Sequence, residues 1–189
     1  MAELSDLWRY ASMLIAAVGM TVSPPAAAGS NAGFGFAFKS IEGGDLNLAK
    51  FAGKPLLVVN TASECGYTPQ YKDLVELWQR YRDKGVIVLG VPSNDFGGQE
   101  PGSEAQIKSF CEVTYGVDFP MTEKQVVIGG EAHPFYKWIA AELGEGATPR
   151  WNFYKYLIGP DGTIAGAWPS TVSPTSATIT KEIDKLLTP

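Results

Sequence analysis

Apolar residues occur along the chain in short runs that predict a small α/β domain. Residues 56–59 and 86–91 are continuous apolar runs, which are typical of strands buried on both faces. Between these runs, apolar residues recur at positions i, i+3, i+4 and i+7, and they predict a helix that runs to about Lys84: Leu74, Leu77, Trp78 and Tyr81. A strand, a helix and a strand in this order predict a parallel βαβ unit.

The rest of the pattern adds strands and helices around this unit. Residues 36–48 predict a hairpin that turns at a glycine pair, and residues 154–168 predict a second hairpin that turns at Asp161-Gly162. Three further helices are predicted, at residues 103–115, 134–143 and 176–187. The predicted fold is therefore one α/β domain of thioredoxin type, in which a mixed β-sheet is flanked by helices.

The first 28 residues have the pattern of an export signal rather than of the domain. Residues 11–22 form an apolar run of signal-peptide length, too short to span a bilayer, and Pro and Ala residues follow it. The charged segment before the run is acidic rather than basic, so a disordered or helical extension is the alternative. We expect residues 1–28 to be a cleaved signal peptide, 29–35 a flexible linker and 36–189 the folded domain. The protein is then periplasmic or secreted, and without cleavage it is cytoplasmic.

Composition argues against several classes of function. The net charge is −5 at pH 7 and the basic residues form no cluster, which disfavours nucleic acid or an anionic membrane surface as a partner. Two cysteines and one histidine are too few for a structural zinc site. We therefore expect neither a metal nor a cofactor.

Cys65 is the candidate nucleophile because it lies between a predicted strand and a predicted helix. Thr68 as N-cap and Pro69 at the first helical position signal a helix start. Free backbone N–H groups and the positive end of the helix dipole favour a thiolate there, and Gly66 lets backbone approach the sulfur. The alternative is a small buried side chain, as most free cysteines are, and Glu64 opposes ionisation. Thr68 also occupies the fourth position of a C-x-x-C motif, which excludes a dithiol within this turn.

Three segments resemble the motifs of the glutathione peroxidases. Residues 60–68, Asn-Thr-Ala-Ser-Glu-Cys-Gly-Tyr-Thr, resemble the catalytic-cysteine motif of that family, residues 96–102 its second motif and residues 151–153 its third. The resemblance runs in one order over about residues 36–187. It implies a thiol peroxidase that reduces hydrogen peroxide and organic hydroperoxides, in which the Cys65 thiolate becomes a sulfenic acid.

The resemblance also implies which side chains assist the thiolate. Gln99, Trp151 and Asn152 would surround the sulfur and donate hydrogen bonds to it or to the peroxide, as amide and indole N–H groups can. Without the resemblance, Gln99 would be interpreted as a solvated loop residue, Trp151 as a core residue and Asn152 as a turn former. The sequence departs from the family at two nearby positions. Ser93 stands where many members have a cysteine, and Asp95 replaces glutamine and adds a negative charge that could slow the enzyme.

Cys111 decides which reductant the resemblance implies. Its segment, residues 109–116, resembles the resolving-cysteine segment of the thioredoxin-dependent branch. In that branch Cys111 would form a disulfide with Cys65, which a thioredoxin-like protein reduces. If Cys111 is instead a buried structural cysteine, glutathione becomes the expected donor. The short link at residues 144–150 lacks the insertion that builds tetramers in some relatives, so we expect a monomer.

The competing function is that of a thioredoxin-fold protein without rapid peroxide turnover, either a disulfide-exchange protein or a redox sensor. Thr68 disfavours disulfide exchange because the second motif cysteine is missing. For the peroxidase, we expect the two cysteines to be too far apart to bond in the reduced state. The C-terminal half of the predicted 103–115 helix would then have to unwind, which Val113, Thr114 and Gly116 favour.

Overall fold

The central element is a four-stranded mixed sheet with the order β4-β3-β5-β6. The structure is a computed structural model, and it describes residues 31–188. β3 (Leu56–Thr61) is parallel to β4 (Ile87–Pro92) and antiparallel to β5 (Lys155–Ile158), which pairs antiparallel with β6 (Ile164–Trp168). This order confirms the predicted parallel βαβ unit and the predicted C-terminal hairpin.

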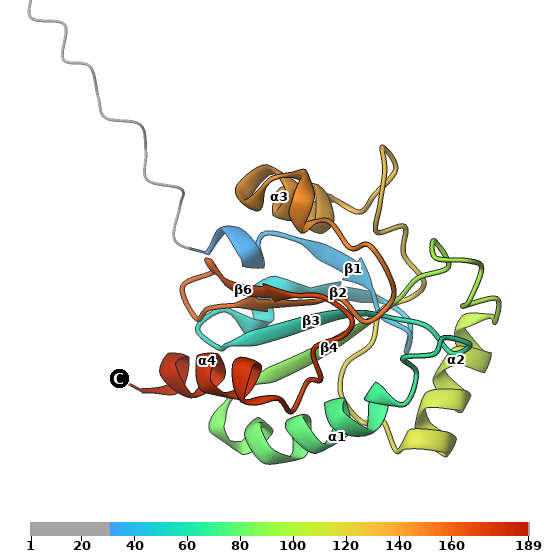
Figure 1. Cartoon of the computed structure of the whole chain (residues 1–189), viewed down its shortest axis with the longest axis horizontal. Coiled ribbons are helices and arrows are strands. Elements are labelled where there is room, and N and C mark those ends of the chain that lie inside the picture. The colour runs from blue at the N-terminus through green and yellow to red at the C-terminus, as the bar shows by residue number, and fades with distance from the viewer. Residues whose placement is uncertain (1–30, 189) are drawn as a thin grey trace, which may run out of the picture.

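Helices cover both faces of this sheet (Figure 1). α1 (Gln70–Tyr81) and α4 (Ala177–Leu187) lie on one face. α3 (Pro134–Leu143) lies on the other face together with the hairpin of β1 (Ala37–Lys39) and β2 (Asp45–Asn47). Short 3₁₀ turns lie between these elements: η1 (Ala32–Phe34), η2 (Leu48–Phe51), η3 (Arg82–Lys84) and η5 (Glu145–Ala147). The layers are those of a thioredoxin-like fold, as predicted.

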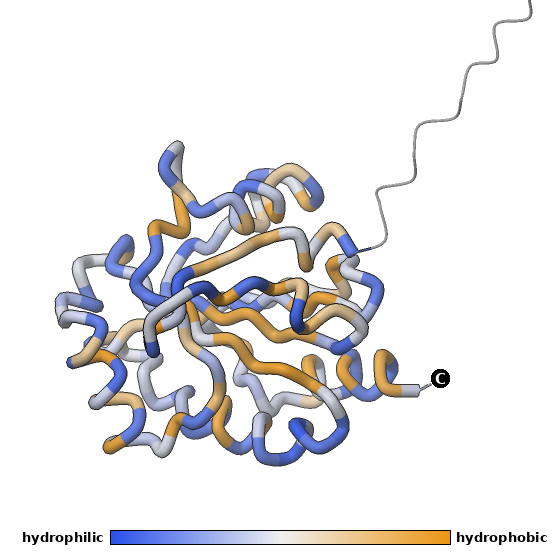
Figure 2. The backbone as a smooth tube through the Cα atoms, turned by 180° about the vertical axis from the view of Figure 1, so that it is seen from behind, coloured by the Kyte–Doolittle hydropathy of each residue, from blue (hydrophilic) through white to orange (hydrophobic). Residues whose placement is uncertain are grey.

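β3 is buried on both sides, which explains its continuous apolar run. Leu57 and Val59 pack toward α1 and α4, whereas Leu56 and Val58 pack toward α3 and the β1–β2 hairpin. In Figure 2 the central strands carry the hydrophobic colour and the outer segments are mixed. β3 therefore joins the two halves of the core. Each of its buried Leu and Val side chains contributes about 1.5–3 kcal/mol to stability.

The predicted 103–115 helix is two different helices. α2 (Glu104–Phe110) begins at a capping box, in which the Ser103 hydroxyl accepts from the Gln106 N–H and the Gln106 side chain accepts from the Ser103 N–H. The segment that follows, η4 (Cys111–Tyr115), is π-helical and ends at Gly116 with φ 69°. Short π-helical segments are rare, and functional sites often contain them.

The folded domain begins earlier than residue 36, where we expected it to begin. Residues 32–34 form η1, and Phe34 is 2% exposed. The N–H groups of Asn31 and Gly33 donate to the carbonyls of Asp161 and Gly162, at 2.6 and 2.9 Å. The part of the predicted linker that the structure describes is therefore packed onto the domain.

The predicted signal peptide, residues 1–28, lies outside the described residues. Among residues 31–188, no helix combines the length and the apolar character that crossing a membrane requires.

Candidate functional site

Cys65 lies on a turn whose shape is set by Thr68. The Thr68 hydroxyl accepts a hydrogen bond from the Cys65 N–H and donates one to the Ala62 carbonyl, both at 2.9 Å. The prediction that Thr68 caps the helix is wrong, because α1 begins at Gln70 and Pro69 stands at its N-cap without a side-chain bond. The hydroxyl closes the cysteine turn instead. A threonine three residues after the cysteine is the sequence signal for this role.

The Cys65 sulfur receives a backbone hydrogen bond. The Tyr67 N–H donates to Sγ at 3.4 Å, and the Cys65 side chain is 7% exposed. Nothing packs within 4 Å of the position where a Cβ would stand on Gly66, so this side of the turn is open. Of the free N–H groups that we predicted to converge on the sulfur, the structure shows one donor, the Tyr67 N–H.

Gln99 and Asn152 are brought to this turn by two hydrogen bonds. The Glu64 N–H, next to the cysteine, donates to the Gln99 carbonyl at 3.0 Å. The Asn152 Nδ2 donates to Gln99 Oε1, also at 3.0 Å, and the Asn152 side chain is fully buried. The second motif, through Gln99, and the third motif, through Asn152, therefore meet the first motif at the Cys65 turn. Because Asn152 holds the oxygen of the Gln99 amide, the amide nitrogen of Gln99 stays free to donate.

Trp151 joins the site from the same segment as Asn152 but is exposed to solvent. Its side chain is 39% exposed and its ring lies 5.9 Å from the Phe96 ring. A Cβ on Gly97 would lie 3.7 Å from Gln99 and 4.0 Å from Trp151, so the second and third motifs are adjacent. Trp151 is therefore not a core residue, which was the alternative interpretation of its sequence position.

Asn60 and Phe153 shape the third motif, although the sequence motifs in which they stand gave neither residue a role. Asn60 in β3 donates from Nδ2 to the Trp151 carbonyl and accepts at Oδ1 from the Tyr154 N–H, each at 3.0 Å. Phe153 has φ 63°, a left-handed conformation that a residue other than Gly rarely adopts. The signal for Asn60 is present in the sequence, as an amide inside an otherwise apolar strand. The conformation of Phe153 has no such signal.

Asp95, one of the two departures from the family pattern, serves a neighbouring loop. Its Oδ2 accepts from the N–H groups of Val127 and Ile128, at 2.6 and 3.2 Å. Ser93 is buried, and its hydroxyl accepts from the Asp95 N–H. The negative charge of Asp95, which we expected near the site, therefore accepts hydrogen bonds from two backbone N–H groups.

Cys111 is the first residue of η4 and is fully buried. Burial raises the pKa of its thiol to about 11, although the nearby Tyr71 hydroxyl acts in the opposite direction. Cys65 and Cys111 are both free thiols, and both belong to the core cluster on the α1 side of the sheet. The structure is therefore that of the reduced protein.

His133 does not take part in this site. It precedes α3, where its Nδ1 accepts from the Phe135 N–H at 3.2 Å and its ring stacks on Phe38 at 3.9 Å. Burial lowers the pKa of His133. Its role is to cap a helix, and no Cys–His pair exists in the part of the chain that the structure describes.

A cavity of about 560 Å³ opens beside Trp151. Aromatic side chains and one cation line it, from the cysteine turn and the third motif: Tyr67, Arg150, Trp151 and Tyr154. An apolar wall with a single cation suits an organic molecule that carries an acidic group.

Comparison with known proteins identifies the family. The model of the glutathione peroxidase family matches residues 34–140, more than half of the chain. The chain belongs to the glutathione peroxidase family. It is 43% identical over 166 residues to the hydroperoxy fatty acid reductase gpx1 of Synechocystis, covering 84% of this chain and 97% of that protein. It is 41% identical over 153 residues to the glutathione peroxidase-like peroxiredoxin 2 of Saccharomyces cerevisiae, covering 79% and 93%.

Solved structures agree with this assignment. The crystal structure of Trgpx in apo form matches with a TM-score of 0.66 at 36% identity over 82% of this chain and 95% of the other. A thioredoxin-family thiol:disulfide interchange protein from Chlorobium tepidum matches with a TM-score of 0.64 at 17% identity over 86% and 100%, which shows the shared fold alone. This member of the glutathione peroxidase family is thus a peroxidase that reduces hydroperoxides.

Proposed function

We propose that the protein is a two-cysteine peroxidase. The Cys65 thiolate attacks one oxygen of a hydroperoxide, the second oxygen leaves as water or an alcohol, and the sulfur becomes a sulfenic acid. Cys111 then condenses with the sulfenic acid to form a disulfide and water. A thioredoxin-like protein reduces the disulfide and restores both thiols.

The observation that carries the peroxide step is the pairing of Gln99 with Asn152 at the cysteine turn. Asn152 fixes the Gln99 amide through Oε1 and so orients its N–H groups. These donors and the Tyr67 N–H would stabilise the charge that develops on the sulfur and on the leaving oxygen. Trp151, half exposed beside Gln99, adds an indole N–H on the solvent side.

The π-helical geometry of η4 supports Cys111 as the resolving cysteine. A buried thiol with a raised pKa is unreactive where it is, so Cys111 must leave its site to resolve the sulfenic acid. A wide helical segment that ends at Gly116 is more easily unwound than a regular α-helix. Unwinding would expose the rings of Phe110 and Tyr115, an apolar patch for a thioredoxin-like donor.

The cavity beside Trp151 supports organic hydroperoxides as substrates besides hydrogen peroxide. Its aromatic wall would hold an acyl chain, and Arg150 would pair with a carboxylate. The name of the Synechocystis relative, a hydroperoxy fatty acid reductase, agrees with such a substrate.

The deciding experiment is steady-state peroxide consumption with two reductant systems. We expect turnover with thioredoxin, thioredoxin reductase and NADPH, and little turnover with glutathione and glutathione reductase. Turnover with glutathione alone would assign the other branch. Slow oxidation of Cys65 without turnover in either system would identify a redox sensor.

We also propose that the protein is exported and acts as a monomer, on the sequence features of residues 1–28 and 144–150. Gel filtration of the mature chain tests the second point, since a dimer would double the apparent mass.

A further inference from the structure

Glu100 is a buried carboxyl group that the proposed peroxide chemistry does not use. It follows Gln99, and no other Asp or Glu among residues 31–188 is buried as it is, with 0% exposed. Neither of its carboxylate oxygens has a hydrogen-bond partner of ordinary geometry, and the nearby Ser63 hydroxyl also lacks one. An unpaired carboxyl costs free energy wherever it is buried, so its position calls for an explanation.

The position of Glu100 is between the two cysteine-bearing segments. It lines a cavity of about 390 Å³ together with Ser63 and Glu64, which immediately precede Cys65. Ile107 and Phe110 of α2 also line this cavity. Ile107 lies one helical turn before Cys111, and Phe110 lies one residue before it. Cys65 and Cys111 therefore each follow directly in sequence on a residue that lines this cavity, Glu64 and Phe110.

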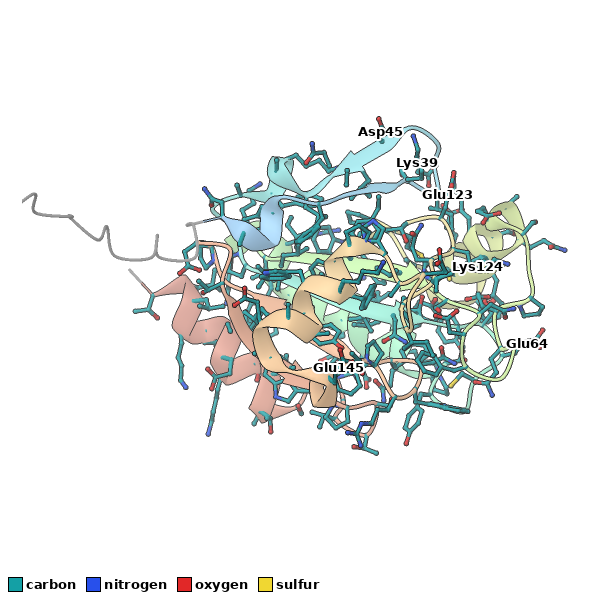
Figure 3. All side chains as sticks on the ribbon, turned by 90° about the horizontal axis from the view of Figure 1, so that it is seen from above. Lys39, Asp45, Glu64, Glu123, Lys124 and Glu145 are labelled. Carbon is teal, nitrogen blue, oxygen red and sulfur yellow. The ribbon has the colours of Figure 1, made fainter. Side chains whose placement is uncertain are left out.

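The charged groups around Glu100 leave its carboxyl able to exchange a proton. The pKa of Glu100 is raised to about 7: burial raises it most and Glu64 adds a smaller increase, while Ser63 and Lys124 act in the opposite direction. Lys124 donates its Nζ to the backbone carbonyls of Glu100 and Gly102 rather than to the carboxylate. Figure 3 shows Glu64 and Lys124 at the same end of the molecule. From the other side, Glu100 contributes to the raised pKa values of Tyr71 and Cys111.

The resolving step needs such a group. In its buried position the Cys111 thiol has a pKa of about 11, so at neutral pH it leaves that position as a thiol and must lose its proton to become a nucleophile. The sulfenic acid of Cys65 must at the same time release its oxygen as water, which requires a proton. One group that takes the first proton and returns it meets both needs.

We propose that Glu100 is the proton-transfer residue of the resolving step, an inference that rests on the two-cysteine mechanism above. Its carboxylate takes the proton of the Cys111 thiol, and the thiolate pair forms the S–S bond to Cys65. The S–O bond breaks with its electron pair on oxygen, and the Glu100 carboxylic acid protonates that oxygen to give water. Glu100 is again a carboxylate at the end, and the sulfenic acid is the only oxidant consumed. Protonation of Glu100 also removes its repulsion of the Cys111 thiolate.

The test is a single-turnover measurement of disulfide formation as a function of pH. Reduced protein receives one equivalent of hydrogen peroxide, and the sulfenic acid and the disulfide are followed by quenching, alkylation and mass spectrometry. In the wild type, the rate constant of disulfide formation should rise through about pH 7, because the carboxylate form is the base. In Glu100→Gln the same step should slow about 10²-fold or more, with accumulation of the sulfenic acid and without the rise near pH 7.

Two variants and the wild-type profile keep the outcomes separate. Glu112→Gln removes an exposed carboxylate next to Cys111 whose charge also raises the pKa of the Cys111 thiol, so this variant should keep the rise near pH 7 without a loss of rate. Glu100→Asp should keep the rise near pH 7 with a partial loss of rate. Wild-type disulfide formation in Glu100→Gln would overturn this inference alone. Should that variant not fold, a wild-type profile without a rise near pH 7 would overturn it as well. Absence of any Cys65–Cys111 disulfide in the wild type would overturn the two-cysteine mechanism together with it.

Discussion

At the residue scale, Cys65 combines burial with a few oriented donors. The side chain is 7% exposed and its sulfur receives one backbone N–H, from Tyr67. The Thr68 hydroxyl bonds both ends of the turn, and the Glu64 N–H bonds the Gln99 carbonyl, so the sulfur is held relative to Gln99. Such preorganised donors stabilise developing charge without reorganising during the reaction.

Replacement of Cys65 by serine should abolish peroxide turnover. A hydroxyl cannot form the sulfenic acid, and the only other sulfhydryl, Cys111, is buried with a raised pKa. Peroxide consumption in the thioredoxin system should fall to the background without enzyme, while the melting temperature stays near that of the wild type. Residual turnover above a trace would contradict the assignment of Cys65.

Removal of one donor should slow the peroxide step without unfolding the protein. Gln99→Ala and Trp151→Ala should each lower the rate of Cys65 oxidation about 10²–10³-fold, because each takes away one donor to the developing charge. The rate is measured by stopped flow with one equivalent of hydrogen peroxide. Gln125→Ala is the matched control, since that amide bonds only to the Glu123 carbonyl in a neighbouring loop. Wild-type rates in both site variants would assign the two residues to packing.

At the element scale, the sequence predicts the strands, the helices and the three motifs, since these depend on local periodicity and spacing. It fails where tertiary contacts decide the geometry. The apolar spacing of residues 103–115 is that of one helix, yet the rings of Tyr71 and Tyr115 pack with their centroids 5.3 Å apart and the Cys111 end widens into the π-helical η4. Glu100 is missed for a similar reason, because a single charged residue in a loop carries no signal of its burial.

Oxidation should unwind η4. One equivalent of hydrogen peroxide should give an intramolecular Cys65–Cys111 disulfide and a loss of helical circular dichroism, because η4 must release Cys111 from the core. The cost is that of a local unfolding event, about a few kcal/mol, and it includes the loss of the contact between the rings of Phe110 and Tyr115. Cys111→Ser is the control, in which the helical signal should not change. A disulfide that forms with the helical signal fully retained would show that η4 does not unwind.

Lys155 in β5 should make stability depend on pH. Its Nζ is buried and donates to Gln70 Oε1 and to the Val172 carbonyl, both at 2.6 Å, so it ties α1 to the loop after β6. Burial lowers the pKa of Lys155 to about 7, from 10.5 in the unfolded chain. Between these values the unfolded state binds more protons than the folded state, so the free energy of unfolding should increase as pH rises from about 7 to 10.5. The same contribution should be lost again as pH falls back to about 7.

Urea unfolding across that pH range tests this expectation. Lys155→Met should be about 1–3 kcal/mol less stable, because the Gln70 and Val172 oxygens lose their donor, and its stability should rise less steeply with pH. Lys181→Met in α4 is the control with an exposed lysine. Identical pH dependence in the wild type and Lys155→Met would show that Lys155 is not the titrating group.

At the scale of the whole molecule, the domain is closed by its own N-terminal segment. η1 packs against the turn between β5 and β6, where Gly33 and Gly162 approach so closely that a Cβ on Gly33 would lie 2.7 Å from the Gly162 carbonyl. Phe34 enters the core on the α3 side of the sheet. We therefore expect any processing of the chain to stop before this segment.

We expect the mature protein to begin near residue 29. Mass spectrometry of the protein from its native host should find residues 1–28 removed, and an intact terminus at Met1 or Ala2 would place the enzyme in the cytoplasm. Truncation of a recombinant chain locates the boundary independently of export. Deletion of 1–28 should leave the unfolding free energy unchanged. Deletion of 1–35 should cost roughly 2–5 kcal/mol, since it removes the buried Phe34 side chain and two backbone hydrogen bonds. Equal stability of the two truncated chains would contradict the role of η1, and it would return the start of the domain to residue 36.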